Sequence, residues 1–326
     1  MNLPKISIVT PSFNQGQYIE QTIRSVLDQG YPNLEYIIID GGSTDNTVEI
    51  IKKYADRISY WVSEPDKGQS DALNKGLAKC TGDIFNWINS DDWLEPGALE
   101  KVAEAFSVND ADIICGYSRI FKDTNGEEMM KHRSELFNDT EATLVRQRIN
   151  QPGMFYKFPV IRDLGGINSN LHYSMDLELW FKYLCSKGQS KIKLTDHLLA
   201  HFRIHDQSKT GVDEQKFREE EKAVWYYLLT SLKVDKAWSS FFAGEKTYQP
   251  LIPWDLRAIN TRDLLTNIAE RYLDAAYKTG HKAFCKKAYR ALYKNGKLSF
   301  NLQHIAMFVK IFIGNIPFRR FFKNHA

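Results

Sequence analysis

Two stretches near the start of the chain decide its fold: residues 6–14 read ISIVTPSFN, and residues 37–45 read IIIDGGSTD. Each is a short apolar run that stops at a polar turn, which is the pattern of a buried strand. Apolar residues recur at helical spacing from Tyr18 to Leu27, and a second helix is predicted at 48–54. Strands that alternate with helices predict an α/β fold, with a mostly parallel central sheet flanked by helices.

The alternation continues to about residue 110. Further strands are predicted at 58–62 and 84–88 and a helix at 69–79, and Pro96 suits the first turn of a following helix. In a parallel sheet, ligands bind beyond the carboxyl ends of the strands. We therefore expect one crevice to be formed by the loops that follow the four strands, at residues 11–14, 40–44, 64–68 and 89–92.

The second half of the chain is organised differently. After residue 112 we expect a strand at 113–121 and a helix at 176–186, separated by a polar stretch. Beyond 215 the chain is helical in pattern and rich in aromatic residues. We therefore predict one domain with halves 1–110 and 111–214, followed by a helical C-terminal region at 215–326.

The composition excludes several classes of protein. No stretch approaches the roughly 20 apolar residues that span a bilayer, and the first residues lack the pattern of a secretory leader. The four cysteines have no paired spacing, which predicts reduced thiols rather than a zinc site or a disulfide framework; they are Cys80, Cys115, Cys185 and Cys285. We therefore expect a cytoplasmic protein.

Two adjacent carboxylates follow the strand predicted at 84–88. Residues 89–92 read NSDD, so Asp91 and Asp92 lie at the edge of the sheet, where a divalent cation on a diphosphate needs hard oxygen ligands. Mn²⁺ or Mg²⁺ is the expected cofactor. The alternative is that one of the two aspartates caps the helix that starts near Pro96.

Several motifs agree in order and spacing with one known family. The two opening stretches, residues 25–29 (SVLDQ) and the NSDD segment together resemble the family 2 glycosyltransferases of the GT-A fold, over roughly residues 4 to 210. The resemblance implies a Rossmann-like GT-A domain of the bacterial cell-surface polysaccharide type, with donor half 1–110 and acceptor half 111–214. It implies inverting, metal-dependent transfer from a nucleoside-diphosphate sugar, with a UDP-sugar favoured, to a glycan or lipid-linked glycan.

By this resemblance, Pro11, Phe13 and Asn14 belong to the donor site, with Phe13 against the nucleotide base. Asp40 would accept a hydrogen bond from the imide N–H of uracil or thymine. Its alternative role is to form the turn before two glycines. The family often has a second acid after this aspartate, and Gly41 replaces that acid here.

A second donor-side segment follows. Residues 64–74 read EPDKGQSDALN and resemble a donor-pocket segment of the bacterial members. Gly68 permits close approach of the backbone to a ligand, and Asp66, Asp71 and Asn74 are further donor-side residues. The alternative is an ordinary loop that enters a capped helix.

The resemblance also assigns a catalytic base. Residues 174–180, SMDLELW, resemble the acidic motif on the acceptor side, and Asp176 is the expected base that removes the proton of the acceptor hydroxyl. Glu178 lies about 200° further round a helix, so the two carboxylates do not face one substrate. The alternative for Asp176 is a surface acid in the first turn of an amphipathic helix.

Residues 201–210, HFRIHDQSKT, resemble the segment that closes the catalytic domain. His205 is the expected metal ligand beside Asp91 and Asp92, since a neutral imidazole is a common ligand. Asp91 is expected to contact the donor as well, and Lys209 can reach phosphate oxygens. The alternative for His205 is a structural role.

The C-terminal segment is basic, because residues 271–326 carry 12 Lys/Arg and one acid. Its apolar residues and interleaved cations have an interfacial pattern; they are Leu302, Ile305, Val309, Phe312, Ile316, Phe318, Phe321 and Phe322, with Arg319, Arg320 and Lys323. We predict peripheral contact with an anionic membrane, on the inner face of a bacterial cell membrane, and no nucleic-acid partner. The alternatives are docking on the body or on a second subunit, and the region after 215 offers a surface for a homodimer.

Two other functions explain fewer of these motifs. A nucleotidyltransferase has an early Gly-rich loop with Arg and Lys, whereas residues 9–20 offer only Gly16. A catalytically silent binding or assembly protein with the GT-A fold is the main alternative, since a fold alone does not imply activity. Four intact carboxylates argue against it: Asp40, Asp91, Asp92 and Asp176.

Overall fold

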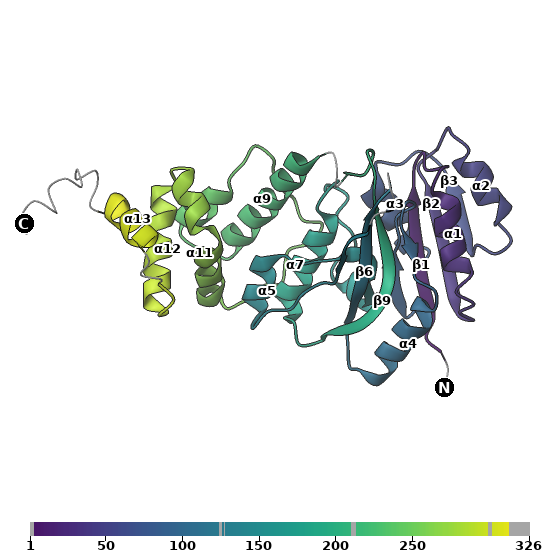
Figure 1. Ribbon diagram of the computed structural model, residues 1–326, viewed down its shortest axis with the longest axis horizontal. Helices are drawn as coiled ribbons and strands as arrows, with labels where there is room; N and C mark the ends of the chain where they lie inside the picture. The colour runs from purple at the N-terminus through teal and green to yellow at the C-terminus, as the bar shows by residue number, and fades with distance from the viewer. Residues whose placement is uncertain (1–2, 124–125, 127, 210–212, 299–301, 313–326) are drawn as a thin grey trace, which may run out of the picture.

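The computed structural model describes residues 3–123, 126, 128–209, 213–298 and 302–312 (Figure 1). The molecule is elongated, with the sheet towards the N-terminal end and the last helices at the other end. No helix in these described ranges is long and apolar enough to cross a bilayer. The four cysteines are buried and unpaired, in agreement with the sequence.

The first half of the chain forms the alternating unit that its sequence predicts. Strands β3, β2, β1 and β4 lie side by side in that order, and all three pairings are parallel. The elements are β1 (Ile6–Ser12), α1 (Ile19–Leu27), β2 (Leu34–Asp40), α2 (Thr47–Lys53), β3 (Tyr60–Ser63), α3 (Gln69–Leu77) and β4 (Ile84–Trp87).

The second half extends the same sheet with mixed pairings. Strand β8 joins β4 to β6 by antiparallel pairing, β9 then pairs parallel with β6, and β5 and β7 pair antiparallel at the edges. The elements are β5 (Trp93–Leu94), α4 (Ala98–Val108), β6 (Ile113–Lys122), β7 (Glu128–His132), α5 (Thr140–Arg146), η1 (Gln151–Gly153), β8 (Met154–Lys157), α6 (Phe158–Asp163), α7 (Met175–Lys187) and β9 (Ile192–Ile204).

Several elements differ from the sequence-based expectation. Pro96 is not in the first helical turn, because α4 begins at Ala98 and Gly97 occupies its N-cap with a φ of 73°. Strand β9 was not predicted, since polar and exposed side chains at 193–197 interrupt its apolar pattern. The polar stretch before residue 150 contains β7 and α5.

The core lies on both faces of the sheet. Ile8 and Ile38 pack towards α1, α2 and α4, whereas Val9 and Ile39 pack towards α3 and α7. Burial on both faces explains why β1 and β2 read as nearly continuous apolar runs. This parallel core fixes the carboxyl ends of the strands, where the predicted crevice lies.

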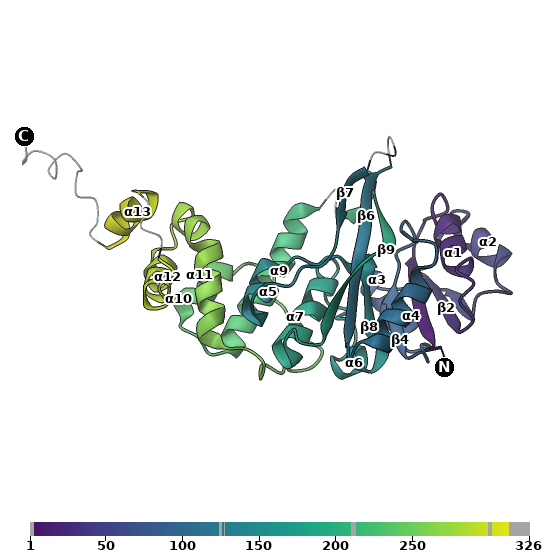
Figure 2. The same cartoon turned by 60° about the horizontal axis from the view of Figure 1, so that its bottom comes forward.

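The C-terminal region packs directly on the part of the chain that forms the sheet (Figure 2). Trp225 meets Phe181 edge to face at 4.9 Å between ring centroids, and the same apolar cluster continues to Ala288. The boundary proposed at residue 214 therefore does not interrupt the packing. The helices are α9 (Glu214–Ser231), α10 (Lys236–Ser239), η2 (Ser240–Phe242), α11 (Thr261–Lys278), α12 (Lys282–Lys294) and α13 (Leu302–Phe312).

The last described helix, α13, docks on α12. Met307 and Ile311 are buried, and the ring of Tyr289 contacts those of Phe308 and Phe312. Part of the tail therefore packs on the body. The remaining tail residues of the interfacial pattern lie outside what the structure describes, namely the side chains of Leu302 and Ile305 and residues 316–323.

Candidate active site

A cavity of about 830 Å³ lies at the carboxyl ends of the parallel strands. All four loops predicted to converge contribute to it, through Pro11, Gly41, Asp66 and Asp91 among others. The second half of the chain completes its wall with residues from β6, η1, α7 and β9. The expectation of one crevice is therefore confirmed.

The predicted site residues divide into two groups. Those that line the cavity are Pro11, Phe13, Asp66, Gly68, Asp91 and Asp176. Those that do not line it are Asn14, Asp40, Asp71, Asn74, Asp92 and His205. Most of the second group make hydrogen bonds that hold the loops of the first group.

Phe13 and Asn14 illustrate this division. The Phe13 side chain is 58% exposed at the cavity, where its ring face is available to a planar ligand. Asn14 has a left-handed backbone with φ of 53°, and its side-chain oxygen accepts a hydrogen bond from Thr44 N. Asn14 thus joins the loop after β1 to the loop after β2 and orients Phe13.

Asp40 is fully buried at the end of β2. Its carboxylate accepts hydrogen bonds from the amides of Gly42 and Ser43 and from the hydroxyls of Ser43 and Ser63. These four bonds give Asp40 the turn-forming role that was its alternative interpretation. Its predicted contact with a base stays a prediction, since the carboxylate does not reach the cavity in this conformation.

Asp66 occupies the space beside Gly41. A Cβ atom placed on Gly41 would lie 2.7 Å from Asp66 Oδ2, so a larger residue at position 41 would displace this carboxylate. Gly68 N donates to Asp66 Oδ1 at 2.7 Å, which orients the acid at the cavity. The family often carries an acid at position 41. In this chain Asp66, from the loop after β3, lies where that acid would lie.

The other two residues of segment 64–74 are structural in their contacts. Asp71 accepts a hydrogen bond from Lys67 N in the turn before α3. Asn74 donates to Ile167 O and accepts from Ile167 N, which ties α3 to the loop before α7. Their predicted contacts with the donor therefore stay predictions.

The paired aspartates differ in their surroundings. Asp91 lines the cavity, and its Oδ2 lies 3.0 Å from His205 Nε2. Asp92 is buried, and its two oxygens accept hydrogen bonds from Arg203 N and Asn89 Nδ2. Burial, and next the charge of Asp91, raise the pKa of Asp92. Asp91 is therefore the carboxylate that reaches the cavity, with His205 buried beside it, and Asp92 fixes the turn.

Arg203 of β9 holds this turn through hydrogen bonds to Asp91 and Asp92. Its guanidinium donates to the backbone oxygen of Asp91 and pairs with Asp123 and Gln21. The ring of Tyr18 lies 4.6 Å from the guanidinium carbon and 4.7 Å from the His205 ring. Arg203 lies in the motif at 201–210, but nothing in that pattern distinguishes it as a residue that holds the site.

The residues present fit a divalent cation shared with a substrate. Within the described ranges no group of three or more acidic, histidine or cysteine side chains surrounds one point. Asp91 and His205 supply two adjacent ligands, and Mg²⁺ commonly takes its remaining ligands from substrate phosphates and water. The donor set therefore suits an ion that arrives with a diphosphate.

Asp176 lies in the first turn of α7 and lines the cavity. Burial is the main cause of the raised pKa of this carboxyl, which is about 6. A hydrogen bond from Leu177 N acts in the opposite direction and lowers the pKa. Glu178 points elsewhere, since it is buried in contact with Lys182 and Tyr248. The two carboxylates do not share a substrate, as the helical geometry predicts.

Several polar residues of the cavity were not found from the sequence. Ser12 Oγ and Gln15 Oε1 are buried at the cavity without a hydrogen-bond partner in the described structure, which suits contact with a polar ligand. Lys209, which was expected from the sequence to reach phosphate oxygens, also lines the cavity, and its Nζ donates to Gln69 Oε1 and His172 O. Ser12 lies within the motif ISIVTPSFN, so the signal was present there.

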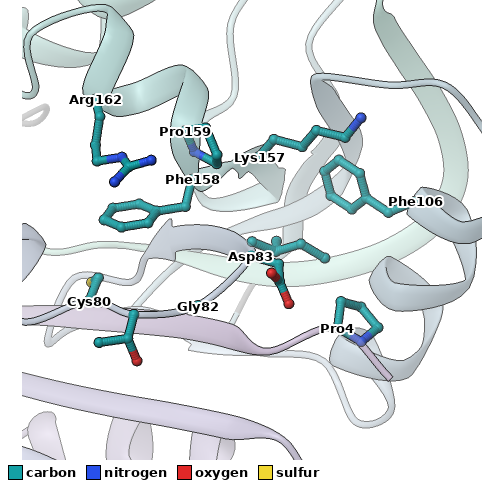
Figure 3. A pocket seen from close by; sticks show the side chains of 11 residues that line it. Pro4, Cys80, Gly82, Asp83, Phe106, Lys157, Phe158, Pro159 and Arg162 are labelled. Carbon is teal, nitrogen blue, oxygen red and sulfur yellow. The ribbon is translucent and has the colours of Figure 1, made fainter. Parts of the chain in front are cut away.

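A second hollow of about 660 Å³ lies near the amino ends of β1 and β4 (Figure 3). Asp83, Lys157 and Arg162 line it, with Arg162 lying over the ring of Phe158. None of the predicted site residues lines this hollow. The candidate site is therefore the cavity at the carboxyl ends.

Comparisons with known proteins identify the family of the chain. Residues 7–169 match the family model described as Glycosyl transferase family 2. An uncharacterized glycosyltransferase of Rickettsia typhi is 28% identical over 236 residues, covering 70% of this chain and 73% of the relative. The putative teichuronic acid biosynthesis glycosyltransferase TuaG of Bacillus subtilis is 36% identical over 143 residues, covering 43% of this chain and 57% of TuaG.

Solved structures show the same fold at low sequence identity. S. aureus TarS 1–349 in complex with UDP-GlcNAc aligns with a TM-score of 0.59 and 14% identity, covering 94% of this chain and 90% of that one. A mannosyltransferase of Pyrobaculum calidifontis in complex with GDP-Man and Mn²⁺ aligns with a TM-score of 0.51 and 16% identity, covering 94% and 79%. Given the extent of the family match and the shared architecture, the chain belongs to glycosyltransferase family 2 and has the GT-A fold.

Proposed function

We propose that this glycosyltransferase is inverting and metal-dependent, and that it moves a sugar from a UDP-sugar to a glycan or lipid-linked glycan. The observation that carries the proposal is the arrangement of one cavity with Asp91 at its wall, His205 3.0 Å behind Asp91, and Asp176 in the first turn of α7. The pair suits a nucleoside diphosphate with its cation, and the lone carboxylate suits an acceptor hydroxyl.

Donor binding is assigned to the loops of the parallel half. Phe13 offers an exposed ring to the base, and Asp66 is an acid at the cavity with one oxygen that has no hydrogen bond to another described residue. Asp40 would meet an imide N–H only after giving up one of its four hydrogen bonds. A UDP-sugar is favoured because TarS, which has the same fold, forms complexes with UDP-GlcNAc and with UDP.

The cation is proposed to be Mn²⁺ or Mg²⁺, held by Asp91 and His205. When bound, such an ion neutralises the charge that develops on the departing diphosphate. Asp92 positions Asp91 through the bonds of its own carboxylate to Arg203 N and Asn89. Lys209, beside the cavity, adds a positive charge towards the phosphates.

Asp176 is proposed as the general base. Its raised pKa of about 6 lies close to neutral pH, where a base combines a useful ionised fraction with appreciable basicity. It would take the proton from the acceptor hydroxyl as that oxygen attacks the anomeric carbon. Because one carboxylate acts in a single displacement, the configuration of the sugar inverts.

Calorimetric titration of UDP, GDP, dTDP and CMP, with and without Mn²⁺, tests the donor site on the wild type, Asp91→Asn and Asp176→Asn. We expect UDP to bind with Mn²⁺, Asp91→Asn to lose the Mn²⁺ dependence, and Asp176→Asn to bind UDP normally. Binding also raises the melting temperature by mass action. Folded protein that binds none of the four would contradict the proposal and favour a catalytically silent assembly protein.

We further propose an acceptor in bacterial surface polysaccharide synthesis and a peripheral position at the inner face of the membrane. TuaG, which is named for teichuronic acid biosynthesis, supports the acceptor class. On α12 four exposed cations recur every fourth residue, and no ion pair links them to another described residue: Lys282, Lys286, Arg290 and Lys294. Like charges at this spacing repel one another and favour an anionic partner.

Co-sedimentation with vesicles tests this surface. We expect the wild type to bind phosphatidylglycerol vesicles in a salt-dependent way, and the Lys286→Glu/Arg290→Glu variant to bind them much less. Phosphatidylcholine vesicles should bind neither protein. Equal binding of both proteins to the anionic vesicles would remove the α12 surface from the proposal.

A further inference from the structure

A single buried carboxylate holds the segment that precedes Asp176. Glu220 of α9 is fully buried, and its oxygens accept hydrogen bonds from three consecutive amides. These are His172 N at 3.0 Å, Tyr173 N at 2.8 Å and Ser174 N at 2.9 Å. Ser174 is the N-cap of α7, so this anchor determines where the helix that carries Asp176 begins.

Lys246 keeps this carboxylate charged. Its Nζ lies 2.5 Å from Glu220 Oε1. Burial by itself would raise the pKa of Glu220, but Lys246 and the three amides outweigh burial and leave the pKa lowered. Hydrogen bonds to an ionised carboxylate are short and strong, so the anchor is rigid.

Residues at the start of α9 contact the same segment, 172–174, at other points. Ser174 Oγ donates to Phe217 O at 3.3 Å, and Tyr173 OH donates to Asp213 Oδ2 at 3.0 Å. The rings of Tyr173 and Phe217 meet edge to face at 5.2 Å. Helix α9 begins after the segment that matches the family model, so these contacts come from outside it.

We propose that Glu220, paired with Lys246, is a positioning residue for Asp176, and that α9 is thereby part of the catalytic unit. The proposal rests on the proposed function, because it requires Asp176 to act as the base. Glu220 does not line the cavity, so it acts through the backbone at 172–174 and not on the substrate.

The charges around Asp176 give a readout that a purely structural role would not change. Burial is the main cause of the raised pKa of Asp176. The negative charge of Glu220 raises this pKa further, whereas Lys209, from the loop after β9, lowers it. Tyr156 of β8 is a further titratable group close to Asp176. Replacing Glu220 by Gln should therefore move the acid limb of the pH–rate profile to lower pH while turnover falls.

The experiment compares the wild type with Glu220→Gln, Glu219→Gln, Asp176→Asn and the Asp176→Asn/Glu220→Gln double variant. Glu219 is the matched control, since it is exposed on the same helix. The measured rate is UDP release from the probe UDP-GlcNAc across the acid limb. Hydrogen exchange of the peptide containing 172–174 and the Kd for UDP are measured on each protein.

We expect Glu220→Gln to lower kcat about tenfold or more, to shift the acid limb to lower pH, and to leave the Kd for UDP within about twofold. Exchange at 172–174 should rise in Glu220→Gln but not in Glu219→Gln. In the Asp176→Asn background the Glu220 change should have no further effect on the rate, because residues that act as a unit are non-additive.

Two results would overturn the inference: unchanged exchange at 172–174 in Glu220→Gln, or an equal fractional loss of rate with and without Asp176. The proposed base is judged separately. If Asp176→Asn alone keeps the wild-type rate, the base assignment is wrong whatever the Glu220 variants do.

Discussion

The loops after β1, β2 and β4 and the turn before α7 meet at one cavity, but different contacts hold them there. The loops after β1 and β2 bind one another, as when Asn14 accepts from Thr44 N and Asp45 accepts from Gly16 N. The turn before Asp176 is instead held from α9 through Glu220.

The two parts of the site therefore depend on different regions of the chain. The loops after β1 and β2 are short and follow a shared parallel core, so their geometry depends mainly on residues close by in the sheet. The proposed base depends on contacts 44 positions away in the chain, from Asp176 to Glu220. Changes in the C-terminal region should therefore affect proton transfer more than nucleotide binding.

The largest expected effect is that of replacing Asp176, which should lower the rate of transfer but leave UDP binding unchanged. Asp176→Asn should lower the rate of transfer by about 10²- to 10⁴-fold, because the base is lost. The affinity for UDP should not change, since Asp176 does not belong to the donor loops. Rate measurements with calorimetry test both expectations, and an equal loss of UDP affinity would contradict the division.

The same variant carries a signed stability prediction. The folded pKa of Asp176 is raised, from 3.8 to about 6, so the stability that this carboxyl contributes is complete below pH 3.8 and is lost as the pH rises towards 6. At pH 8, Asp176→Asn should therefore be more stable than the wild type by about 1–3 kcal/mol. Urea titrations at pH 8 and pH 3.5 should show a difference only at the higher pH.

Trp225 tests whether the C-terminal region unfolds with the sheet. It is fully buried between Phe181 and Phe242, so Trp225→Ala should cost about 3–5 kcal/mol. Because the cluster is continuous, loss of UDP binding and loss of helical signal should shift together on denaturation. The neighbouring exposed Tyr226→Ala is the control, and two separate transitions would instead support independent domains at residue 214.

Glu35 offers the opposite pH dependence in the donor half. Burial would raise its pKa, but contacts with Lys5, Ser7 and Thr81 lower it from 4.5 to about 2. Its stabilisation is therefore present above pH 4.5 and is lost as the pH falls towards 2. Glu35→Gln should cost about 1–3 kcal/mol at pH 7, measured by urea titration.

The exposed Glu49→Gln is the matched control for Glu35. It should leave the stability within about 0.5 kcal/mol. A cost of Glu35→Gln that persists undiminished at pH 2 would show that packing, and not charge, accounts for the effect.

The smallest expected effect concerns Asp66, whose carboxylate lies beside Gly41. Gly41→Ala would place a Cβ against the flexible end of Asp66, so the acid should move while the fold is kept. We expect UDP affinity to fall about tenfold, or about 1.4 kcal/mol, and the double variant Gly41→Asp/Asp66→Gly to recover part of it. Gly244→Ala, which meets no neighbour, is the control; unchanged affinity in Gly41→Ala would show that Asp66 does not bind the donor.

The sequence predicts the parallel half well because its signals are local. Strand periodicity with polar turns places Pro11, Gly41 and Asp91 at one edge, and the structure brings them to one cavity. Patterns cannot show which carboxylates become buried, so Asp92 resembles Asp91 although only Asp91 lines the cavity.

The rest could not be found because it depends on tertiary contacts. Glu220 lies in the run EEEK at 219–222, which has the composition of a solvated helix surface. Nothing in that run distinguishes it from exposed Glu219 until α9 packs against the turn before α7. Strand β9 was missed for a similar reason, since it pairs along its length with β6 despite its polar stretch.

Arg203 joins parts of the chain that leave the ribosome at very different times. Its guanidinium connects Gln21 and Asp91, which are made early, to Asp123, and it arrives only with the last strand of the sheet. Glu220 and Lys246 follow later still. A nascent chain that has completed its nucleotide-binding loops therefore still lacks both the clamp on Asp91 and the anchor of Asp176. Under the proposed function, a chain truncated before Lys246 should therefore keep its parallel half but transfer no sugar.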